Sequence, residues 1–325
     1  MRTRIALIAT LAGALLAGGV AMVRSGAEGP RDTSAALPAS TIQAVVDGRS
    51  VEWWRSADAP SRWTASLPAL AAAVRWRDSS AAISWGELSL EGMGEAKHIR
   101  VILARVDPRR AALRLAGARA DFPPLEARWT IADAPDDALL ALNAGQFDVG
   151  GAWGWVVRDG RELQGARPAP LAPAVVVDAE GRVAIVAAAH IDSVRRAGRV
   201  REAFQSYPAL LVGGEVPAPL RAAGRGVDVA HRDARLALGT LPDGRVLVAL
   251  TRFEGLGGAL ELLPFGLTTP EMAALMGALG CRDAVLLDGG VSGQLAIHGA
   301  RGERREWPGL RRVPLGLIAT PIAER

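Results

Sequence analysis

Residues 268–294, TTPEMAALMGALGCRDAVLLDGGVSGQ, describe a helix, a buried strand and a glycine-rich turn in succession. Thr268 offers a hydroxyl N-cap and Pro270 suits a first helical turn. The apolar residues that follow recur at helical spacing, which predicts a helix that Gly280 ends. Residues 284–287 are all apolar and predict a short buried strand. Because this strand runs directly into Asp288, we expect a carboxylate at a strand end beside a glycine loop.

Hairpin signals fill the chain before this passage. Asp-Gly pairs, and one Glu-Gly pair, stand between extended apolar runs, where glycine accepts the positive φ of a tight turn. The pairs begin at Asp47, Asp159, Glu180 and Asp243. They predict that 153–158 pairs with 161–164, 174–177 with 182–187, and 236–239 with 245–250.

These hairpins define the expected fold class. Further strands are expected at 88–90, 98–106 and 112–115, and a second helix at 67–74. Hairpins combined with a helix that feeds a buried strand predict an α+β fold with a mixed, hairpin-rich β-sheet core and a few packed helices.

The N-terminus predicts export. Arg2 and Arg4 precede an uncharged apolar run from Ile5 to Val23, so we interpret residues 1–24 as a signal peptide or a signal anchor. Residues 25–40, rich in Ala, Pro and small polar residues, are interpreted as a linker. We expect a periplasmic or cell-envelope location, with membrane contact only through this N-terminal segment if it is not cleaved.

Tryptophan is concentrated directly after the linker. Five of the nine Trp residues lie within 41–85, which we interpret as an accessory N-terminal segment before a main domain at 86–325. Packing explains such a cluster more simply, and a platform that stacks sugars is the alternative.

Composition excludes several kinds of partner and site. Three of the 38 basic side chains, and no acidic one, lie in residues 1–24, so the rest of the chain carries 35 basic against 34 acidic side chains. A nearly neutral body without a dense basic run argues against nucleic-acid binding. Cys281 is the single cysteine, so no intramolecular disulfide forms. The four histidines are isolated and no metal-binding motif occurs, so we expect no metal and no cofactor.

Two places before the terminal motif carry candidate binding residues. An apolar run at 138–142 leads into Asn143, whose amide could hold a substrate oxygen, and Gly145, which permits close backbone approach. Gln205 and Ser206 precede another apolar run. At both places the local sequence favours an ordinary turn or strand start.

Two further places carry charge. Arg235 enters an otherwise apolar strand, and a buried guanidinium needs either a protein carboxylate or an anionic substrate group. Asp288 is followed by Gly289 and Gly290, whose amides can point at an anion, and by Ser292. The residues around Ser292 do not form the turn of a serine hydrolase, and no lysine follows as in a nucleotide-binding loop.

The order of these motifs resembles the phosphodiester glycosidase family, in particular its bacterial exported branch. The resemblance covers about residues 86–320 and is most specific at Leu287-Asp-Gly-Gly-Val-Ser292. The family usually has Asn-Gly-Gly-Phe or Asn-Ala-Gly-Met where this chain has Asn143-Ala-Gly-Gln-Phe, and Val291 and Gly293 interrupt the last motif. The asparagine, the arginine and the aspartate are kept.

The resemblance implies hydrolysis of a sugar 1-phosphodiester at its anomeric carbon. Asp288 would act as base or nucleophile, with Glu254 as the leading second carboxylate. Arg235 and the amides of Gly289–Gly293 would hold the phosphate, while Asn143 and Gln205 would orient the substrate. A phosphomonoester has a second pKa near ~6 and leaves as a stable anion, so a strong general acid is less necessary than in other glycosidases.

Two other functions fit the same residues. One is a non-catalytic envelope module that binds sugar-phosphate or polysaccharide chains. The other is a phosphodiesterase that cuts the P–O bond, although most such enzymes use metal clamps. In every case the expected partner is a small or polymeric sugar phosphate.

Overall fold

The computed structural model describes residues 36–117, 127–255, 261–263, 265–299 and 302–322. The predicted leader, 1–24, and most of the linker lie outside these residues. Residues 34–325 form one compact unit. Within the described residues no helix is both long enough and apolar enough to cross a membrane.

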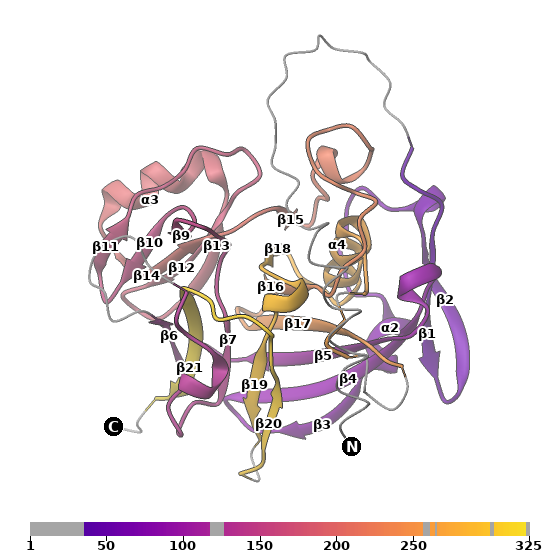
Figure 1. The fold of residues 1–325 in the computed structure, drawn as a ribbon, viewed down its shortest axis with the longest axis horizontal. Coiled ribbons are helices and arrows are strands. Elements are labelled where there is room, and N and C mark those ends of the chain that lie inside the picture. The colour runs from indigo at the N-terminus through magenta and orange to yellow at the C-terminus, as the bar shows by residue number, and fades with distance from the viewer. Residues whose placement is uncertain (1–35, 118–126, 256–260, 264, 300–301, 323–325) are drawn as a thin grey trace, which may run out of the picture. The chain divides into compact units, whose positions relative to one another are not determined.

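A nine-stranded antiparallel sheet forms the centre of this unit (Figure 1). Its order is β15-β18-β16-β17-β5-β4-β1-β2, and β3 also pairs with β4. The strands are β1 Thr41–Val46, β2 Arg49–Arg55, β3 Arg75–Ser79, β4 Ile83–Glu91, β5 Ile99–Val106, β15 Ala209–Leu211, β16 Leu236–Thr240, β17 Val246–Phe253 and β18 Asp283–Leu287.

Two five-stranded sheets and one two-stranded ribbon complete the β-structure. The first sheet has the order β11-β10-β14-β12-β13, and the second β20-β19-β7-β21-β6. Their strands are β6 Ala111–Gly117, β7 Leu140–Asn143, β10 Val156–Arg158, β11 Arg161–Gln164, β12 Ala174–Asp178, β13 Val183–Val186, β14 Val200–Gln205, β19 Leu295–His298, β20 Arg304–Trp307 and β21 Leu315–Pro321; the ribbon is β8 Phe147–Asp148 with β9 Gly151–Ala152.

Helices are few and short. The α-helices are α2 Pro68–Ala73, α3 Ile191–Ala197 and α4 Thr269–Ala278. The 3-10 helices are η1 Ser56–Asp58, η2 Gly94–Ala96, η3 Ile131–Asp133, η4 Ala188–His190, η5 Ala218–Leu220 and η7 Gly290–Ser292. The expected α+β fold with a hairpin-rich core is therefore confirmed, with antiparallel strands dominating.

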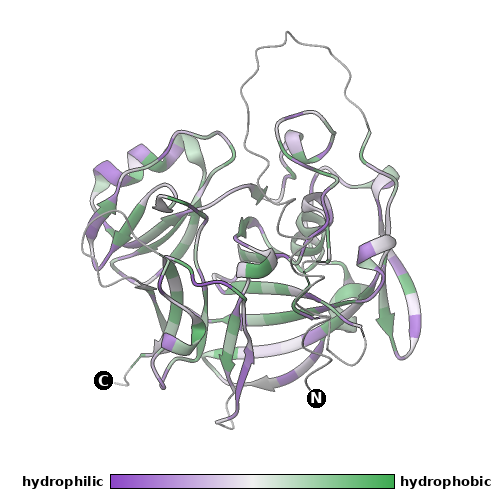
Figure 2. Ribbon diagram, in the orientation of Figure 1, coloured by the Kyte–Doolittle hydropathy of each residue, from purple (hydrophilic) through white to green (hydrophobic). Residues whose placement is uncertain are grey.

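Alternate side chains of a strand point to opposite sides of a sheet, and the central sheet packs against a hydrophobic core on each of its two faces. On one face, Ile102 and Leu250 share a core with Leu142 and Val175 of the two smaller sheets. On the other face, the next residues along, such as Val101, join a core with α4. In Figure 2 the central strands β5 and β17 are hydrophobic along much of their length.

The predicted hairpins are confirmed, and so are both predicted helices, as α2 and α4. β10 pairs with β11, β12 with β13, and β16 with β17. The turn at Asp159-Gly160 has φ values of 50° and 77°, so both of its residues are left-handed. In α4, the Thr268 hydroxyl accepts the Glu271 amide, and the Glu271 carboxylate accepts the Thr268 amide, as in a capping box.

The Trp-rich segment 41–85 contributes strands to the central sheet. β1, β2 and β3 belong to that sheet, and the boundary expected after residue 85 falls inside β4. Four of the five indoles pack against the two cores on either side of the sheet, and Trp76 is the more exposed exception. Packing thus accounts for most of this cluster.

Candidate active site

Asp288 lies directly after β18, where the expected carboxylate follows a buried strand. Burial raises the pKa of Asp288 to about 6. A hydrogen bond from the Ser292 hydroxyl and the positive charge of Arg311 lower this pKa, while the negative charge of Asp233 raises it further. Asp288 can therefore exchange a proton near neutral pH, which general acid–base catalysis requires.

Asp233 is the second carboxylate at this place, and the sequence analysis did not single it out. A Cβ added to Gly290 would lie 2.9 and 3.0 Å from the two Asp233 carboxylate oxygens, so Asp233 faces the glycine loop. Its Oδ1 is buried without a hydrogen-bond partner among the described residues. Burial raises the pKa of Asp233, and the charges of Arg235 and His231 oppose that rise.

Strand pairing brings the two aspartates together. Leu236 of β16 pairs with Leu287 of β18 in antiparallel register. Residues that precede 236 therefore lie beside residues that follow 287, and the Gly290 amide accordingly donates to the Ala234 carbonyl, at 2.6 Å. Both strands could be predicted from the sequence, but their register could not, so Asp233 was not distinguished from other loop acids.

Asn143 fixes the glycine loop from the end of β7. Its Nδ2 donates to the Asp288 carbonyl at 2.7 Å, and its Oδ1 accepts the Gln294 amide at 2.9 Å. The side chain is buried. Asn143 therefore lies at the predicted site, where it holds both ends of the loop in place.

The glycine loop satisfies much of its own hydrogen bonding. The amides of Ser292 and Gly293 both donate to the Gly289 carbonyl, at 3.0 and 3.1 Å. With the Gly290 amide also bonded, the expected anion cradle over Gly289–Gly293 is reduced, and only the amides of Gly289 and Val291 remain as candidates. The glycines also permit close packing, because a Cβ at Gly289 would lie 2.3 Å from the Ala234 carbonyl oxygen.

Arg235 is buried beside this loop and bonds to backbone. Its Nε donates to the Leu267 carbonyl at 2.8 Å and its Nη2 to the His231 carbonyl at 2.6 Å. Burial lowers its pKa, whereas the charges of nearby acids, with Asp233 first, raise it. The question left open by the sequence, protein partner or substrate, is answered in part: Arg235 holds the segment that carries Asp233.

Gln205 and Ser206 are buried residues that support the site. Gln205 Oε1 accepts the amides of Trp155 and Arg167, both at 3.0 Å, and its Nε2 donates to the Arg167 and Ala172 carbonyls. The Ser206 hydroxyl donates to the Leu286 carbonyl at 2.6 Å, just before Asp288.

Gly145 lies between Gln205 and the end of β18 that bears Asp288. It has a φ of +71°, and its carbonyl accepts the Asp288 amide at 3.1 Å. A Cβ at Gly145 would lie 3.1 Å from the Gln205 carbonyl oxygen. The two motifs that the sequence could not distinguish from ordinary turns therefore both contact the strand end that bears Asp288.

Glu254, expected as the second carboxylate, has no contact with Asp288 among the described residues. It is exposed beyond the end of β17, and its amide donates to the His98 carbonyl. The acid whose charge acts on Asp288 is Asp233. Another residue of β17, Arg252, contacts the glycine loop by donating a hydrogen bond to the Gly293 carbonyl. The geometry therefore favours Asp233 over Glu254 as the partner of Asp288.

The structure also bears on the single cysteine and on the residue types that bind metals. Cys281 is buried, and burial raises the pKa of its thiol, which disfavours the reactive thiolate. Within the described ranges, no group of three or more His, Cys, Asp and Glu side chains is arranged to hold a metal ion.

Residues 136–320 match the family model of phosphodiester glycosidases, and this region is more than half of the chain. The chain therefore belongs to the phosphodiester glycosidase family. The matched region contains Asn143, Asp233, Arg235 and Asp288. No curated protein sequence matches the chain.

Solved structures resemble the chain at low sequence identity. The catalytic domain of zebrafish N-acetylglucosamine-1-phosphodiester alpha-N-acetylglucosaminidase, auto-inhibited by its pro-peptide, is 16% identical with a TM-score of 0.57, over 78% of this chain and 87% of that chain. A hypothetical protein from Synechocystis is 14% identical with a TM-score of 0.50, over 86% of this chain and 68% of that chain. A candidate exported protein from Burkholderia pseudomallei is 17% identical with a TM-score of 0.48, over 73% and 77%. The first two similarities show that the fold is shared, and nothing beyond the fold is inferred from any of the three.

Proposed function

We propose that this protein hydrolyses sugar 1-phosphodiesters at the anomeric carbon and releases a free sugar and a phosphomonoester. The observation that carries the proposal is the Asp288–Asp233 pair, in which Asp288 follows the buried strand β18 and Asp233, just before β16, faces the glycine loop. Membership of the phosphodiester glycosidase family supports the same reaction class.

The two carboxylates give the site its acid–base chemistry. Because like charges disfavour joint ionisation, the pair holds one proton over part of the neutral range. In the reaction, ionised Asp288 takes a proton from water that adds to the anomeric carbon, or attacks that carbon itself to form a glycosyl ester that water then hydrolyses to release the sugar. The bond between the anomeric carbon and the phosphate oxygen breaks, and the phosphomonoester leaves with the electron pair.

The leaving group lowers the demand for a general acid. A phosphomonoester has a second pKa near ~6, so it departs with little protonation at neutral pH. The charge of Arg235, which already acts on Asp233, and the amides of Gly289 and Val291 are the candidate contacts for the phosphate.

Product analysis tests the proposal. The full-length protein is incubated with UDP-N-acetylglucosamine and with other sugar 1-phosphodiesters, and the products are resolved by mass. We expect free sugar, and its loss in Asp288→Asn. Sugar 1-phosphate as product would instead place the cleavage at phosphorus, and saturable binding without any product would favour a non-catalytic binding module.

We also propose that the protein is exported to the cell envelope. The basic start and the apolar run Ile5–Val23 support this location. Fractionation of bacteria that express the full chain should place it in the periplasm or membrane, and deletion of residues 2–24 should leave it in the cytoplasm. A cytoplasmic full-length protein would contradict this proposal.

A further inference from the structure

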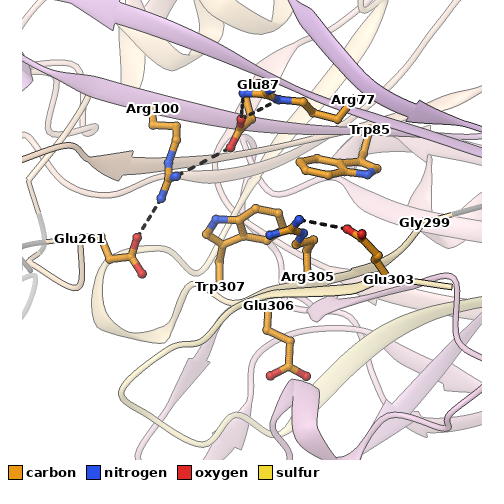
Figure 3. Close-up of a pocket in the computed structure, with 10 residues that line it drawn as sticks. All are labelled: Arg77, Trp85, Glu87, Arg100, Glu261, Gly299, Glu303, Arg305, Glu306 and Trp307. Atoms are coloured by element: carbon orange, nitrogen blue, oxygen red, sulfur yellow. Dashed lines mark hydrogen bonds and ion pairs between the residues drawn. The ribbon is translucent and has the colours of Figure 1, made fainter. Parts of the chain in front are cut away.

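A cavity of about 500 Å³ lies between the central sheet and the β19–β20 hairpin (Figure 3). Trp85 of β4 and Trp307 of β20 form one part of its lining, with ring centroids 5.8 Å apart and an angle of 63° between the ring planes. None of the candidate catalytic residues belongs to this lining. Its volume is that of an ordinary small-molecule site.

All but one of the charged lining residues are paired with one another, and the exception, Glu306, is paired with Arg304 outside the lining at 2.7 Å. Glu87 contacts Arg77 at 2.8 Å and Arg100 at 3.7 Å. Arg100 also contacts Glu261 at 2.8 Å, and these contacts appear as dashed lines in Figure 3. On the opposite wall Arg305 contacts Glu303 at 2.9 Å.

This charge pattern selects the kind of ligand. The lining holds three arginines and four glutamates, but Glu306 is neutralised by Arg304, so a phosphate would meet no net positive charge and only arginines that are already bonded to a carboxylate. Paired carboxylates and guanidinium groups still offer acceptors and donors to hydroxyl groups, and indole rings offer apolar surface to C–H groups. A neutral sugar residue combines those two surfaces.

The cavity is joined to the glycine loop by a short stretch of chain. Arg252 lies opposite Arg100 in the pairing of β17 with β5. Its Nη2 donates to the Gly293 carbonyl of the loop and to the Pro308 carbonyl, directly after Trp307. The Leu310 amide in turn donates to the Val291 carbonyl at 2.7 Å. The segment after Trp307 thus runs from the cavity wall to the loop that carries Asp288.

We propose that this cavity is a saccharide subsite that binds a neutral sugar residue of a substrate containing more than one sugar. Its role as a substrate subsite rests on the proposed function, whereas the binding of neutral saccharide does not. The two sites then divide the ligand, with the phosphodiester at the Asp288 loop and a second sugar at Trp85 and Trp307.

Calorimetric titration of the full-length protein with chitotriose, cellotriose and mannotriose tests the subsite directly. Trp85→Ala removes half of the indole lining, and Arg305→Ala removes an exposed donor of the opposite wall without touching the core. Trp76→Ala is the matched control, because Trp76 pairs with Gly86 on the neighbouring strand and stacks under Arg105 away from the cavity.

We expect at least one trisaccharide to bind saturably at millimolar concentrations. Its affinity should fall at least about tenfold in Trp85→Ala, and should fall in Arg305→Ala, while Trp76→Ala stays within about twofold of the wild type. If Trp85→Ala does not fold, as judged by circular dichroism, Arg305→Ala decides. The proposal is overturned if no trisaccharide binds, or if affinity does not respond to the cavity variants.

Asp288→Asn separates this proposal from the proposed function. It should bind the trisaccharide as the wild type does. If the wild type shows no hydrolysis of any sugar 1-phosphodiester but binds saccharide through Trp85, the proposed function fails and the binding of saccharide in the cavity stands. If the wild type hydrolyses a sugar 1-phosphodiester but its trisaccharide affinity does not respond to Trp85→Ala, the proposed function stands and the saccharide subsite is overturned.

Discussion

Asp288 and Asp233 belong to different strand ends, and each is placed by its neighbour on the paired strand. The Asp288 pKa of about 6 results chiefly from burial, with a contribution from the negative charge of Asp233. In the proposed reaction, the ionisation of Asp288 therefore controls activity on the acidic side of neutrality.

The first prediction concerns Asp288 itself. Because the ionised carboxylate acts on water or on the sugar, kcat/KM of the wild type should rise with pH and level off above about 6. Asp288→Asn should lower kcat/KM by about 10²–10⁴-fold, the range of a lost acid–base group. Full activity of a folded Asp288→Asn protein would contradict the assignment.

The second prediction concerns Asp233. Asp233→Asn removes a negative charge that raises the Asp288 pKa, so the rising limb of the pH–kcat/KM profile should move to lower pH. Glu254→Gln is the control, because that side chain is exposed beyond β17 and should leave the profile unchanged. If Glu254→Gln moved the limb and Asp233→Asn did not, the replacement of Glu254 by Asp233 would be wrong.

At the scale of elements, the site is a loop fixed by side chains from neighbouring strands. Asn143 of β7 bonds to the loop at Asp288 and at Gln294, and so couples the smaller sheet to the strand end of β18. A buried amide with two such bonds cannot be removed without leaving loop backbone groups unpaired.

Asn143→Ala should therefore lower the free energy of unfolding by about 1–3 kcal/mol and lower kcat, because Asp288 is no longer held in position. Chemical denaturation and steady-state kinetics measure the two effects. As a control, Asn143→Asp keeps the acceptor for the Gln294 amide and should be less destabilising at low pH, where its carboxyl can also donate. A variant that lost substrate affinity alone, with stability unchanged, would favour direct substrate contact instead.

Glu202 of β14 is a second place where burial has a measurable consequence. It accepts the Leu115 amide of β6 at 3.2 Å and thereby connects the two smaller sheets. Burial, the largest cause, raises its pKa to about 7. In the unfolded chain its pKa is near the ordinary value of about 4.3, so the folded state binds more protons between these values.

The free energy of unfolding should therefore fall as pH rises from about 4.5 to about 7, by about 4 kcal/mol at most from this group. Glu202→Gln should remove that slope, and its stability relative to the wild type should increase over the same range. Urea denaturation at several pH values gives the slope. A wild-type and a Glu202→Gln protein with parallel pH dependence would refute the assignment.

Local sequence predicted local structure well and the site less well, for a physical reason. The turn at Asp159-Gly160 and the cap at Thr268 depend on a few adjacent residues, and both are present in the structure. The partner of Asp288 depends on the register of β16 with β18, which is set by packing across the whole sheet. The sequence therefore indicated Asp288 but selected Glu254 rather than Asp233.

The same distinction applies to the polar residues. A strand-end asparagine or glutamine in the sequence is compatible with substrate contact. Only the structure shows that the side chain of Asn143 bonds to the backbone of the glycine loop, and that of Gln205 to the backbone of residues 155, 167 and 172. Asp233 could have been singled out from the sequence only if the pairing of β16 with β18 had been known, because that pairing brings Asp233 beside Gly290.

At the scale of the whole molecule, the Trp-rich segment is part of the central sheet. β4 pairs with β5 along its length, and β1 pairs with β4 in turn. A protein that starts at residue 86 would lose four strands or parts of strands and expose Val101 and its core neighbours.

We therefore expect that deletion of residues 1–85 prevents folding, whereas deletion of residues 1–33 leaves a protein with one cooperative thermal transition. Circular dichroism and differential scanning calorimetry compare the two. A folded, active protein that starts at residue 86 would show that the segment is a separate accessory element.

The central claim is that the bond broken is that between the anomeric carbon and oxygen. Hydrolysis of UDP-N-acetylglucosamine by the full-length protein in water enriched in heavy oxygen tests it most directly, with mass analysis of both products. The account predicts that the heavy oxygen enters the free sugar and not the phosphate. Heavy oxygen in a phosphate product would place the attack at phosphorus and contradict it.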